Sequence, residues 1–480
     1  MLLSALTAQI GPVQITGPTD RHVERVVYDS REAGTADVFV AIRGKRVDAR
    51  DFVPDLDVAA VIADGPVQAR EGVTVVQVED ARRALAIAAA AIEGNPGAQF
   101  PVVGVTGTNG KTTVTFMLEA IIAASGGTSG VIGTTGHRIA GHSIPASHTT
   151  PEAPVMQSLL RQMVDQGCTA GLMEVSSIGI AMSRADAIPF QVAIFTNFSR
   201  DHLDFHPSLD DYQSAKAELF HRLLAQSGTA IINSDDPAHT AMMPSDRETW
   251  TYGLGSGAQI RGVALQPSVH GTQLQVLTPS AEHTLFLPLL GQHNVCNALA
   301  AFAAATAIGI SPEQAISGLQ SLSTVPGRLE PVQNDRGFTV LVDYAHTPDA
   351  MKAVLRSLRS LSRGRILTVF GCGGDRDPGK RPEMGAAASE GSDWVYVTSD
   401  NPRHEDPMDI IKAITAGIGG PHTVEPDRGR AIAIAINSAK PEDIVLIAGK
   451  GHETTQTTGG VTIAFDDRVV AADVLSGGTS

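Results

Sequence analysis

The sequence predicts an α/β protein of three domains, and two patterns support this prediction. Short Val-, Ile- and Ala-rich runs alternate with longer helical segments from residue 98 onward, which is typical of a mostly parallel sheet covered by helices. Clusters of Pro and Gly at 94–97 and 326–327 interrupt this alternation. We therefore expect a small mixed α/β domain over 1–97, a central P-loop ATPase-like parallel-sheet domain over 98–325, and a C-terminal Rossmann-like, doubly wound domain over 326–480.

Length and composition exclude several classes of protein. A chain of 480 residues has room for about three domains with their own cores. A net charge of -15 argues against a nucleic-acid partner, which needs a basic face. Cys168, Cys296 and Cys372 lack paired or metal-ligand spacing, which indicates reduced structural thiols. With no basic residue before Arg21 and an apolar run of only 298–310, we expect a monomeric cytoplasmic protein without a membrane span.

The first domain carries short strands followed by a helix. β-rich runs lie at 25–28, 38–42, 59–62 and 73–76, and a helix is expected over 81–93 with Asp80 as its N-cap. Polar loops follow two of these runs, one at Asp29-Ser30-Arg31 and one at Gly44-Lys45-Arg46-Val47-Asp48. Taken alone, these loops are more simply interpreted as ordinary turns.

The second domain opens on a phosphate-binding loop. A buried strand over 102–106 runs into Gly107-Thr108-Asn109-Gly110-Lys111-Thr112-Thr113, and a helix over 111–125 follows. Backbone N–H groups of such a turn hold phosphates, the lysine reaches the outer phosphates, and the threonine is placed to ligate magnesium. The spacing departs from the usual P-loop, because Val105 stands where that motif has its first glycine. We predict that the loop binds a nucleoside triphosphate.

Further polar residues follow the next strands of this domain. Strands are expected at 130–132, 171–175 and 192–196, and a helix begins near Pro151 after Thr150. Glu174 ends a buried strand beside the loop and is a candidate magnesium ligand. A helix over 209–225 places Lys216 on its apolar side, where spacing alone favours a lysine that extends to solvent. Residues 228–290 are β-rich, and 291–297 open a long Ala-rich helix.

The third domain repeats the strand-helix alternation without a P-loop. Strands are expected at 338–342, 366–370, 394–397 and 444–447, with helices near 348–361, 407–417 and 428–438. Polar loops follow these strands at 343–346, 373–377, 400–403 and 449–453. Because the carboxyl ends of parallel strands meet at one edge of a sheet, these loops predict a binding cleft that faces the nucleotide domain.

These motifs, taken in their order along the whole chain, resemble those of the Mur ligase family. The motifs that carry the resemblance are 107–113, Glu174-Val175-Ser176-Ser177, Phe195-Thr196-Asn197 with Asp201-His202-Leu203-Asp204, 291–297, 326–330, 343–348 and 449–453. The resemblance implies an ATP-dependent ligase that activates a carboxylate as an acyl phosphate, with ATP and Mg²⁺ bound. It also implies a UDP-N-acetylmuramoyl-L-alanyl-D-glutamate substrate and a role in peptidoglycan synthesis.

The resemblance also implies roles for particular residues. The catalytic and magnesium-binding residues would be Lys111, Thr112, Glu174, His202 and Lys216, the last as a carbamate. The remaining ATP-site residues would be Gly107, Thr108, Asn109, Gly110, Thr113, His293, Asn294, Asn297, Arg328 and Asp343. The UDP-muramoyl dipeptide would meet Tyr28, Ser30, Lys45, Arg46, Val47, Thr149, Thr150, Ser176 and Arg184. Carbamylation of Lys216 is chemically reasonable, since a desolvated lysine has a lowered pKa and its neutral amine adds carbon dioxide.

The loop Asp400-Asn401-Pro402-Arg403 resembles that of family members that add the third residue of the stem peptide, with meso-diaminopimelate as the amino acid. By this resemblance Arg403 grips the far carboxylate of diaminopimelate, which L-lysine lacks. The amino acid would meet Arg376, Asp400, Asn401, Pro402, Arg403, Gly449 and Glu453.

Two positions depart from the family pattern, and three alternatives stay open. Ile178 stands where a histidine is common, and Asp48-Ala49-Arg50 where Asp-Gly-His or Asp-Gly-Arg is usual, which affects substrate contacts and not the reaction. One alternative is a ligase that adds L-lysine. A second is another Mur or folylpolyglutamate-type ligase, although the loop at 400–403 is not expected there. A third is a Mur-like subunit that binds nucleotide without catalysis.

Overall fold

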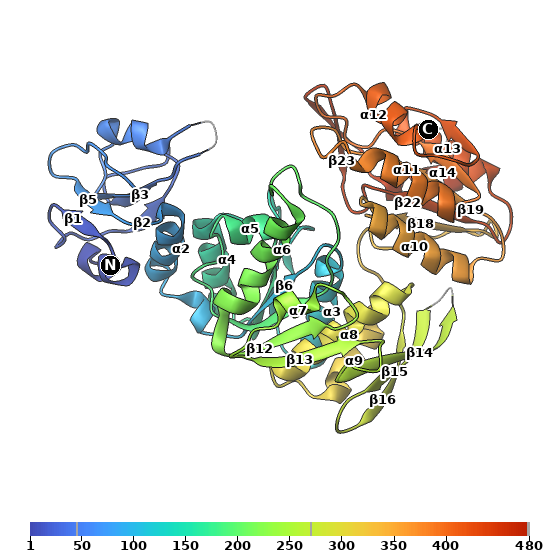
Figure 1. Ribbon diagram of the computed structural model, residues 1–480, viewed down its shortest axis with the longest axis horizontal. Coiled ribbons are helices and arrows are strands. Elements are labelled where there is room, and N and C mark those ends of the chain that lie inside the picture. The colour runs from blue at the N-terminus through green and yellow to red at the C-terminus, as the bar shows by residue number, and fades with distance from the viewer. Residues whose placement is uncertain (45–46, 269–270, 478–480) are drawn as a thin grey trace.

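The chain folds into three units in a row, each built on one main β-sheet (Figure 1). The computed structural model describes residues 1–44, 47–268 and 271–477. The central unit lies between the other two (Figure 1). This arrangement confirms the predicted α/β class with its three sheets. Within the described residues, no helix combines the length and apolar character needed to cross a bilayer.

The N-terminal unit is a five-stranded mixed sheet in the order β1-β5-β4-β3-β2. Strand β1 runs antiparallel to β5, and the other neighbours are parallel. Its elements are α1 (Leu3–Ile10), β1 (Gln14–Thr16), β2 (Arg25–Val27), β3 (Asp37–Ala41), the 3-10 helix η1 (Ala49–Asp55), β4 (Ala60–Ala63), β5 (Thr74–Gln77) and α2 (Ala81–Ile92). The side chain of Asp80 accepts hydrogen bonds from the N–H groups of Arg82 and Arg83, so the predicted N-cap of α2 is confirmed.

The central unit contains an eleven-stranded sheet in the order β16-β15-β14-β13-β12-β11-β6-β10-β7-β8-β9. The strands from β14 to β7 in this order are parallel, and antiparallel strands extend both ends. The strands are β6 (Val102–Thr106), β7 (Ser129–Ile132), β8 (His137–Ile139), β9 (His142–Ile144), β10 (Ala170–Glu174), β11 (Phe190–Phe195), β12 (Leu224–Asn233), β13 (Glu248–Gly253), β14 (Ile260–Ser268), β15 (Gly271–Leu277) and β16 (Glu282–Leu287).

Helices cover both faces of the central sheet. They are η2 (Pro96–Ala98), α3 (Lys111–Ala124), α4 (Ala153–Asp165), α5 (Ser177–Ala181), α6 (Leu209–Glu218), α7 (His239–Met242), α8 (Gln292–Ala307) and α9 (Pro312–Ser321). Apolar residues of α3, α8 and α9 pack with one set of alternate strand residues, which includes Val103 and Val105. Residues of α4 and α5 pack with the opposite set, which includes Val102 and Met173. The two cores therefore hold the strand ends of β6 and β10 firmly beside each other.

The helix predicted over 209–225 is shorter in the structure. Helix α6 ends at Glu218, a π-helical turn η3 (Leu219–Leu223) follows, and Leu224 already pairs with Phe190 in the sheet. The side chains of Leu219, Phe220 and Leu223 are buried. The helix prediction is confirmed to Leu223, although its last turn is π-helical, and it was wrong for residues 224 and 225, where strand pairing outweighs the local helical preference.

The C-terminal unit is a six-stranded sheet in the order β17-β18-β22-β19-β20-β21, with only β17 antiparallel to its neighbour. Helices α10, α11 and α12 pack on one face, and α13 and α14 pack on the other, which confirms the doubly wound prediction. The elements are β17 (Glu330–Val332), β18 (Thr339–Asp343), α10 (Pro348–Leu361), β19 (Ile366–Phe370), α11 (Lys380–Gly391), β20 (Trp394–Val397), α12 (Pro407–Thr415), β21 (His422–Val424), α13 (Arg428–Ser438), β22 (Ile444–Ala448), the hairpin β23 (Thr455–Thr458) and β24 (Val461–Ala464), and α14 (Asp467–Leu475).

Candidate functional site

A cavity of about 800 Å³ lies between the central and C-terminal units. The loops after β6, β7, β10 and β11 line one side, and residues 343–354 with Arg376 line the other. This volume falls in the usual range for sites that bind small molecules. The cavity therefore brings together strand ends from two separate sheets.

The loop between β6 and α3 has the backbone of a phosphate cradle. Gly107 and Gly110 have φ angles of 145° and 90°, and a Cβ atom at Gly107 would collide with the hydroxyl of Thr196. The Nζ of Lys111 donates to the carbonyl oxygens of Gly107 and Thr108, each at 2.8 Å. Burial lowers the pKa of Lys111. The ammonium group is thus poorly hydrated and is bonded to neutral carbonyl oxygens. It would bond more strongly to the charged oxygens of a phosphate.

Glu174 is held at the end of β10 with its side chain only 1% exposed. Its Oε2 accepts hydrogen bonds from the hydroxyls of Thr112 at 3.0 Å and Thr134 at 2.9 Å, and its Oε1 accepts from the N–H of Thr134 at 3.0 Å. Thr134 was not among the predicted site residues. It lies two residues beyond the end of β7, so the rule that placed Glu174 at a strand end could also have found Thr134.

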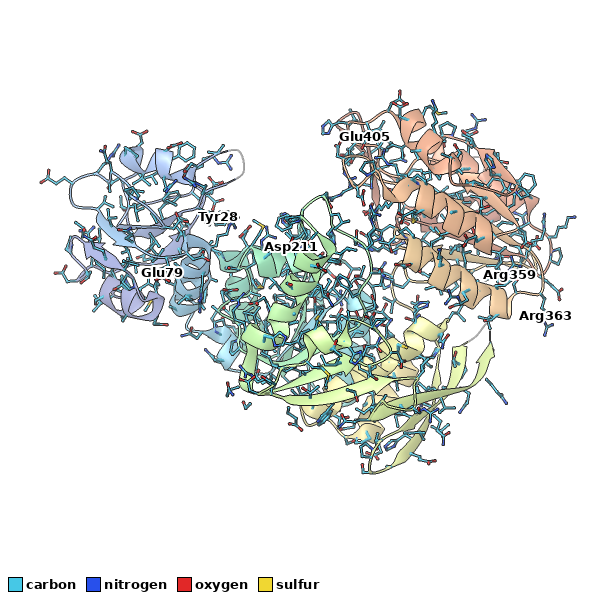
Figure 2. All side chains as sticks on the ribbon, viewed as in Figure 1. Tyr28, Glu79, Asp211, Arg359, Arg363 and Glu405 are labelled. Carbon is cyan, nitrogen blue, oxygen red and sulfur yellow. The ribbon has the colours of Figure 1, made fainter. Side chains whose placement is uncertain are left out.

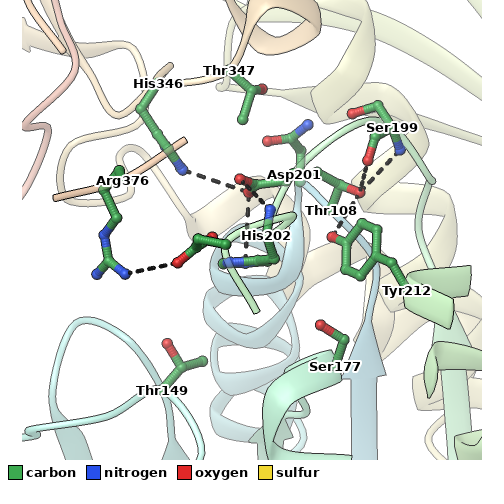
Figure 3. Close-up of polar contacts among 12 residues, drawn as sticks. Thr108, Thr149, Ser177, Ser199, Asp201, His202, Tyr212, His346, Thr347 and Arg376 are labelled. Carbon is green, nitrogen blue, oxygen red and sulfur yellow. Dashed lines mark hydrogen bonds and ion pairs between the residues drawn. The ribbon is translucent and has the colours of Figure 1, made fainter. Parts of the chain in front are cut away.

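Asp201 lies between two histidines at the edge of the cavity (Figure 3). Its Oδ2 is 3.6 Å from Nε2 of His202 and 3.9 Å from Nε2 of His346. Burial lowers the pKa of His202 to about 4, although the Asp201 carboxylate partly offsets this effect. Burial by itself raises the pKa of Asp201, but His202, His346 and Lys380 outweigh it and lower that pKa to about 2. At neutral pH the His202 imidazole is therefore uncharged, which is the form that binds a metal ion.

Lys216 lies on α6 with its side chain 1% exposed. Its Nζ stands 4.4 Å from the centroid of the Tyr212 ring, whose hydroxyl lies 3.2 Å from the hydroxyl of Thr108. Burial, together with repulsion from Lys111, lowers the pKa of Lys216 far below its ordinary value. Spacing alone had favoured a lysine that extends to solvent, but the Lys216 side chain is buried. It presents a buried amine at the cavity wall, in a state that can act as a nucleophile.

The predicted ATP-site residues mostly line the same cavity. His293, Asn297, Arg328 and Asp343 contribute to its wall, whereas Asn294 lies behind them. Asn294 Oδ1 accepts a hydrogen bond from Asn297 Nδ2 at 3.0 Å, so it orients that side chain. The Nδ1 of His293 is buried without a hydrogen-bond partner in the described part of the chain, and burial lowers the pKa of His293 to about 4. A buried polar atom without a partner is consistent with a position that meets a ligand.

The residues expected to meet the UDP-muramoyl dipeptide divide into two groups. Thr149, Thr150, Ser176 and Arg184 line the cavity. Thr150 is held by three bonds: its hydroxyl donates to the carbonyl of Glu174 at 2.8 Å and accepts from the N–H of Ser176 at 3.0 Å, and its carbonyl accepts from Arg184 at 2.9 Å. The other group belongs to the N-terminal unit, and its described members Tyr28, Ser30 and Val47 do not line the cavity. Lys45 and Arg46 lie outside the described residues.

Tyr28 nevertheless lies on the side of the N-terminal unit that faces the central unit (Figure 2). Burial is the main cause that raises its pKa, and the Glu152 carboxylate adds to this effect. Glu152 is also paired with Arg184, at 2.7 Å. The N-terminal group is therefore electrostatically connected to the central group, although it lies beyond the cavity wall.

Of the residues expected to meet the amino acid, Arg376 lines the cavity. Its Nη1 is 3.4 Å from Oδ2 of Asp204 on the facing unit. The others, Asp400, Asn401, Pro402, Arg403, Gly449 and Glu453, lie together outside the cavity wall in the C-terminal unit. There the guanidinium of Arg403 donates to the carbonyl of Gly374 at 2.6 Å.

Ile178 lines the cavity at the position where the sequence departs from the family pattern. The hydroxyl of its neighbour Ser177 lies 3.0 Å from Nε2 of His206, and both side chains are buried. His206 was not among the predicted site residues. It supports the turn that carries Ile178, but it does not line the cavity itself.

The side chains at the cradle include donors of the kind that magnesium prefers. Within the described residues, no three His, Cys, Asp or Glu side chains are already grouped as a metal site. The Thr112 hydroxyl and the Glu174 carboxylate are hard oxygen donors in direct contact, and His202 adds a neutral nitrogen. Magnesium in phosphate sites takes one or two carboxylates and completes its shell with phosphate oxygens and water. The residues therefore fit magnesium that arrives with a nucleotide.

Comparison with known families matches two parts of the chain. Residues 105–305 match the Mur ligase middle domain. Residues 327–451 match the family described as Mur ligase, glutamate ligase domain. The first match contains the phosphate cradle with Glu174, His202 and Lys216, and the second contains Asp343, Arg376 and the loop at 400–403.

Individual relatives are similar over their full length. A UDP-N-acetylmuramoyl-L-alanyl-D-glutamate--2,6-diaminopimelate ligase of Geobacter metallireducens is 42% identical, over 98% of this chain and 97% of the relative. The ligase of the same name from Gloeobacter violaceus is 44% identical, over 99% and 98%. A solved structure of such a ligase aligns with a TM-score of 0.72 at 32% identity, covering 99% of each chain. Thermotoga maritima MurF in complex with ADP shares the fold, with a TM-score of 0.64, 21% identity and coverage of 95% and 96%.

Proposed function

The chain belongs to the Mur ligase family, and we propose that it is the member that joins meso-diaminopimelate to UDP-N-acetylmuramoyl-L-alanyl-D-glutamate at the expense of ATP. It is an ATP-dependent ligase that forms an amide bond in peptidoglycan precursor synthesis. The observation that carries this proposal is the shared cavity, where the phosphate cradle meets Thr150 and Arg184 on one side and Arg376 on the other. We expect a monomer that acts in the cytoplasm, where ATP is available.

The proposed reaction has two steps, and its reactants are ATP, the UDP-muramoyl dipeptide and diaminopimelate. A free carboxylate of the glutamyl residue attacks the γ-phosphorus of ATP, and ADP leaves. The amine of diaminopimelate then attacks the acyl carbon, a tetrahedral intermediate forms, and phosphate leaves as the amine loses its proton. Catalysis of this kind consists mainly of positioning and of charge neutralisation.

Lys111 and the loop N–H groups hold the phosphates in this proposal. On ATP binding, the Lys111 ammonium exchanges the carbonyls of Gly107 and Thr108 for phosphate oxygens. Arg328 lies close enough to assist, since its Nη2 is 3.3 Å from the Thr112 hydroxyl. His293 and Asn297 line the adjoining wall, where the nucleoside would lie.

Thr112, Glu174 and His202 would hold magnesium. The ion would neutralise the charge that develops on the phosphates during transfer. Thr134 supports this role, because its two hydrogen bonds fix both oxygens of Glu174. The chain's own contribution is thus a carboxylate that is already oriented before ligands bind.

Lys216 would act as a carbamate. Its buried amine has a strongly lowered pKa, so the neutral form that adds carbon dioxide is well populated. The product is an anion placed among the cations of the cavity, where it would support magnesium in the same way as a carboxylate side chain.

The two remaining substrates approach from opposite units. Tyr28, Ser30 and the loop Lys45-Arg46-Val47 would hold the uridine nucleotide, and Thr149, Thr150, Ser176 and Arg184 would hold the muramoyl dipeptide. Asp400, Asn401, Pro402, Arg403, Gly449 and Glu453 would hold the amino acid together with Arg376. Arg403 would bind the far carboxylate of diaminopimelate through a bidentate pair.

A coupled phosphate-release assay tests the proposal. We expect release only when ATP, the UDP-muramoyl dipeptide and meso-diaminopimelate are all present. L-Lysine is offered in place of diaminopimelate and should give less than about a thousandth of the rate, because the half-buried Arg403 guanidinium would be left without its carboxylate. Comparable turnover of L-lysine would contradict the assignment of the amino acid. No release with any amino acid would indicate a subunit that binds nucleotide without catalysis.

A further inference from the structure

A buried lysine joins the two loops that we assign to the amino acid. Lys450 follows β22, and its side chain is 0% exposed. Its Nζ donates to the carbonyl of Thr455 at 2.6 Å, to Glu453 Oε2 at 3.2 Å and to Asn401 Oδ1 at 3.4 Å. An ammonium group has three N–H donors, and these three acceptors use all of them. Lys450 therefore has no donor left for a substrate.

The bonds of Lys450 leave the Asn401 amide only one orientation. Asn401 Oδ1 also accepts a hydrogen bond from the N–H of Thr457 at 3.0 Å, and Asn401 Nδ2 donates to Glu453 Oε2 at 2.8 Å. A flipped amide would place its NH₂ group against the ammonium and against the Thr457 N–H. Since the ammonium and the amide both contact Oε2, they also orient the Glu453 carboxylate.

The same lysine fastens the hairpin that carries the backbone of Arg403. Thr455, the acceptor of the shortest Lys450 bond, is the first residue of β23. The N–H of Arg403 donates to the carbonyl of Thr457 at 2.9 Å, and its carbonyl accepts from Gly459 at 2.6 Å. Arg403 has a φ of 54°, in the left-handed region that a residue with a side chain rarely adopts. Such a conformation persists only where surrounding contacts impose it, and here the hairpin supplies them.

A second buried cation in this unit shows what a purely structural role looks like. Arg428 and Asp467 form a bidentate pair, with both bonds at 2.7 Å and both side chains 0% exposed. The guanidinium also donates to the carbonyl of Ala448 at 3.0 Å, at the end of β22. Arg428 thus ties α13, α14 and the sheet together, whereas Lys450 ties together loops that surround a binding site.

We propose that Lys450 is a positioning residue for amino-acid binding and specificity. It sets the Asn401 amide and the Glu453 carboxylate, and through β23 it stabilises the backbone that aims Arg403. It does so without contact to the substrate. The inference rests on the proposed function in one respect, namely that Asn401, Arg403 and Glu453 hold the incoming amino acid.

The test is the substitution Lys450→Met, which keeps the length of the side chain and removes the ammonium. We expect the KM for meso-diaminopimelate to rise about 10- to 100-fold, since hydrogen bonds to charged groups are lost. The KM values for ATP and for the UDP-muramoyl dipeptide should stay within about twofold, because these sites share no bond with Lys450. The preference for diaminopimelate over L-lysine should also narrow. Lys440→Met, which changes an exposed lysine of the same unit, is the matched control.

A second variant, Lys450→Gln, keeps the test decisive if Lys450→Met does not fold. Lys450→Gln keeps an amide donor and removes the charge, so its effect on the diaminopimelate KM should be smaller but in the same direction. An unchanged diaminopimelate KM in a folded variant overturns the proposal, as does a fall in kcat with every KM unaltered. Failure of both variants to fold would assign Lys450 the structural role of Arg428 and would also overturn it. If the wild-type enzyme prefers another amino acid, the proposed function is wrong, and the same KM comparison with that amino acid still decides the role of Lys450.

Discussion

The edges of the central and C-terminal sheets solve different binding problems with the same architecture. Both place polar residues at the carboxyl ends of parallel strands. At the central edge burial lowers the pKa of both Lys111 and Lys216, and repulsion from Lys111 lowers the pKa of Lys216 further. At the C-terminal edge the polar groups of Asn401, Lys450 and Glu453 already bond one another. At the first edge the Lys111 ammonium is bonded to backbone carbonyls that phosphate oxygens would replace, whereas the second edge is pre-organised for a small ligand.

This difference predicts the size of mutational effects. At the central edge, a substitution removes charge stabilisation that becomes strong in the transition state, so kcat should fall steeply. At the C-terminal edge, a substitution removes orientation of the bound amino acid, so its KM should rise instead. The predictions below follow this order, from the largest expected effect to the smallest.

Lys111→Ala should nearly abolish ligation. The variant loses the one ammonium that the cradle directs to the outer phosphates, and we expect turnover to fall at least about 1,000-fold. Phosphate release measures the loss, and thermal unfolding shows that the fold is retained. Lys412→Ala, at an exposed lysine of α12, is the control. Retention of more than about a tenth of the wild-type rate would count against the phosphate cradle.

Lys216→Ala should be nearly inactive but open to chemical rescue. If the lysine acts as a carbamate, its loss removes an anion that supports magnesium, and we expect a fall of about 100-fold or more. Added acetate or formate should restore part of the activity, because a small carboxylate can occupy the vacated volume. The same salts added to the wild-type enzyme control for ionic strength. Full activity of the variant, or electron density for an unmodified amine in the active enzyme, would rule out the carbamate.

Arg403→Ala tests the pre-organised edge. We expect the KM for meso-diaminopimelate to rise about 10- to 100-fold, while the KM for ATP changes by less than about twofold. Steady-state kinetics with each substrate varied in turn gives both values. Arg430→Ala removes an exposed arginine of the same unit, 3.4 Å from Glu425, and should change neither KM. An equal rise in both KM values would indicate a general loss of structure instead of a lost contact.

Arg200→Ala should have the smallest effect, because it breaks only exposed contacts between the two edges. Arg200 is 3.1 Å from Glu383 and 3.4 Å from Asp377, across the two units, and it is 40% exposed. Exposed ion pairs contribute little, so we expect KM changes below about threefold.

We also expect ATP with the dipeptide to draw the units together by a hinge near 324–327, and small-angle scattering can follow this closure in wild type and variant. Identical wild-type profiles with and without ligands would exclude the closure.

Local patterns predicted the parts of the site that the backbone builds by itself. The phosphate cradle at 107–113 could be predicted from the sequence, because the glycines that adopt its positive φ angles, Gly107 and Gly110, and the following helix lie within a few residues of one another. The Asp80 cap of α2 was predicted for the same reason. The resemblance to a family then assigned roles to residues such as Lys216, for which spacing alone had favoured the opposite placement.

Long-range pairing decided the rest. The end of α6 at Glu218 depends on the pairing of β12 with β11, and the burial of Lys216 depends on the packing around it. The bonds of Thr134 to Glu174 and the approach of His346 to Asp201 join residues 40 or more positions apart in the chain. The sequence by itself determined the fold class, the strand-end loops and the phosphate cradle, because each depends on local backbone preferences and hydrophobic period. Only the tertiary structure decided which strand ends share a cavity, because burial and the pKa shifts that follow from it are properties of the packed molecule.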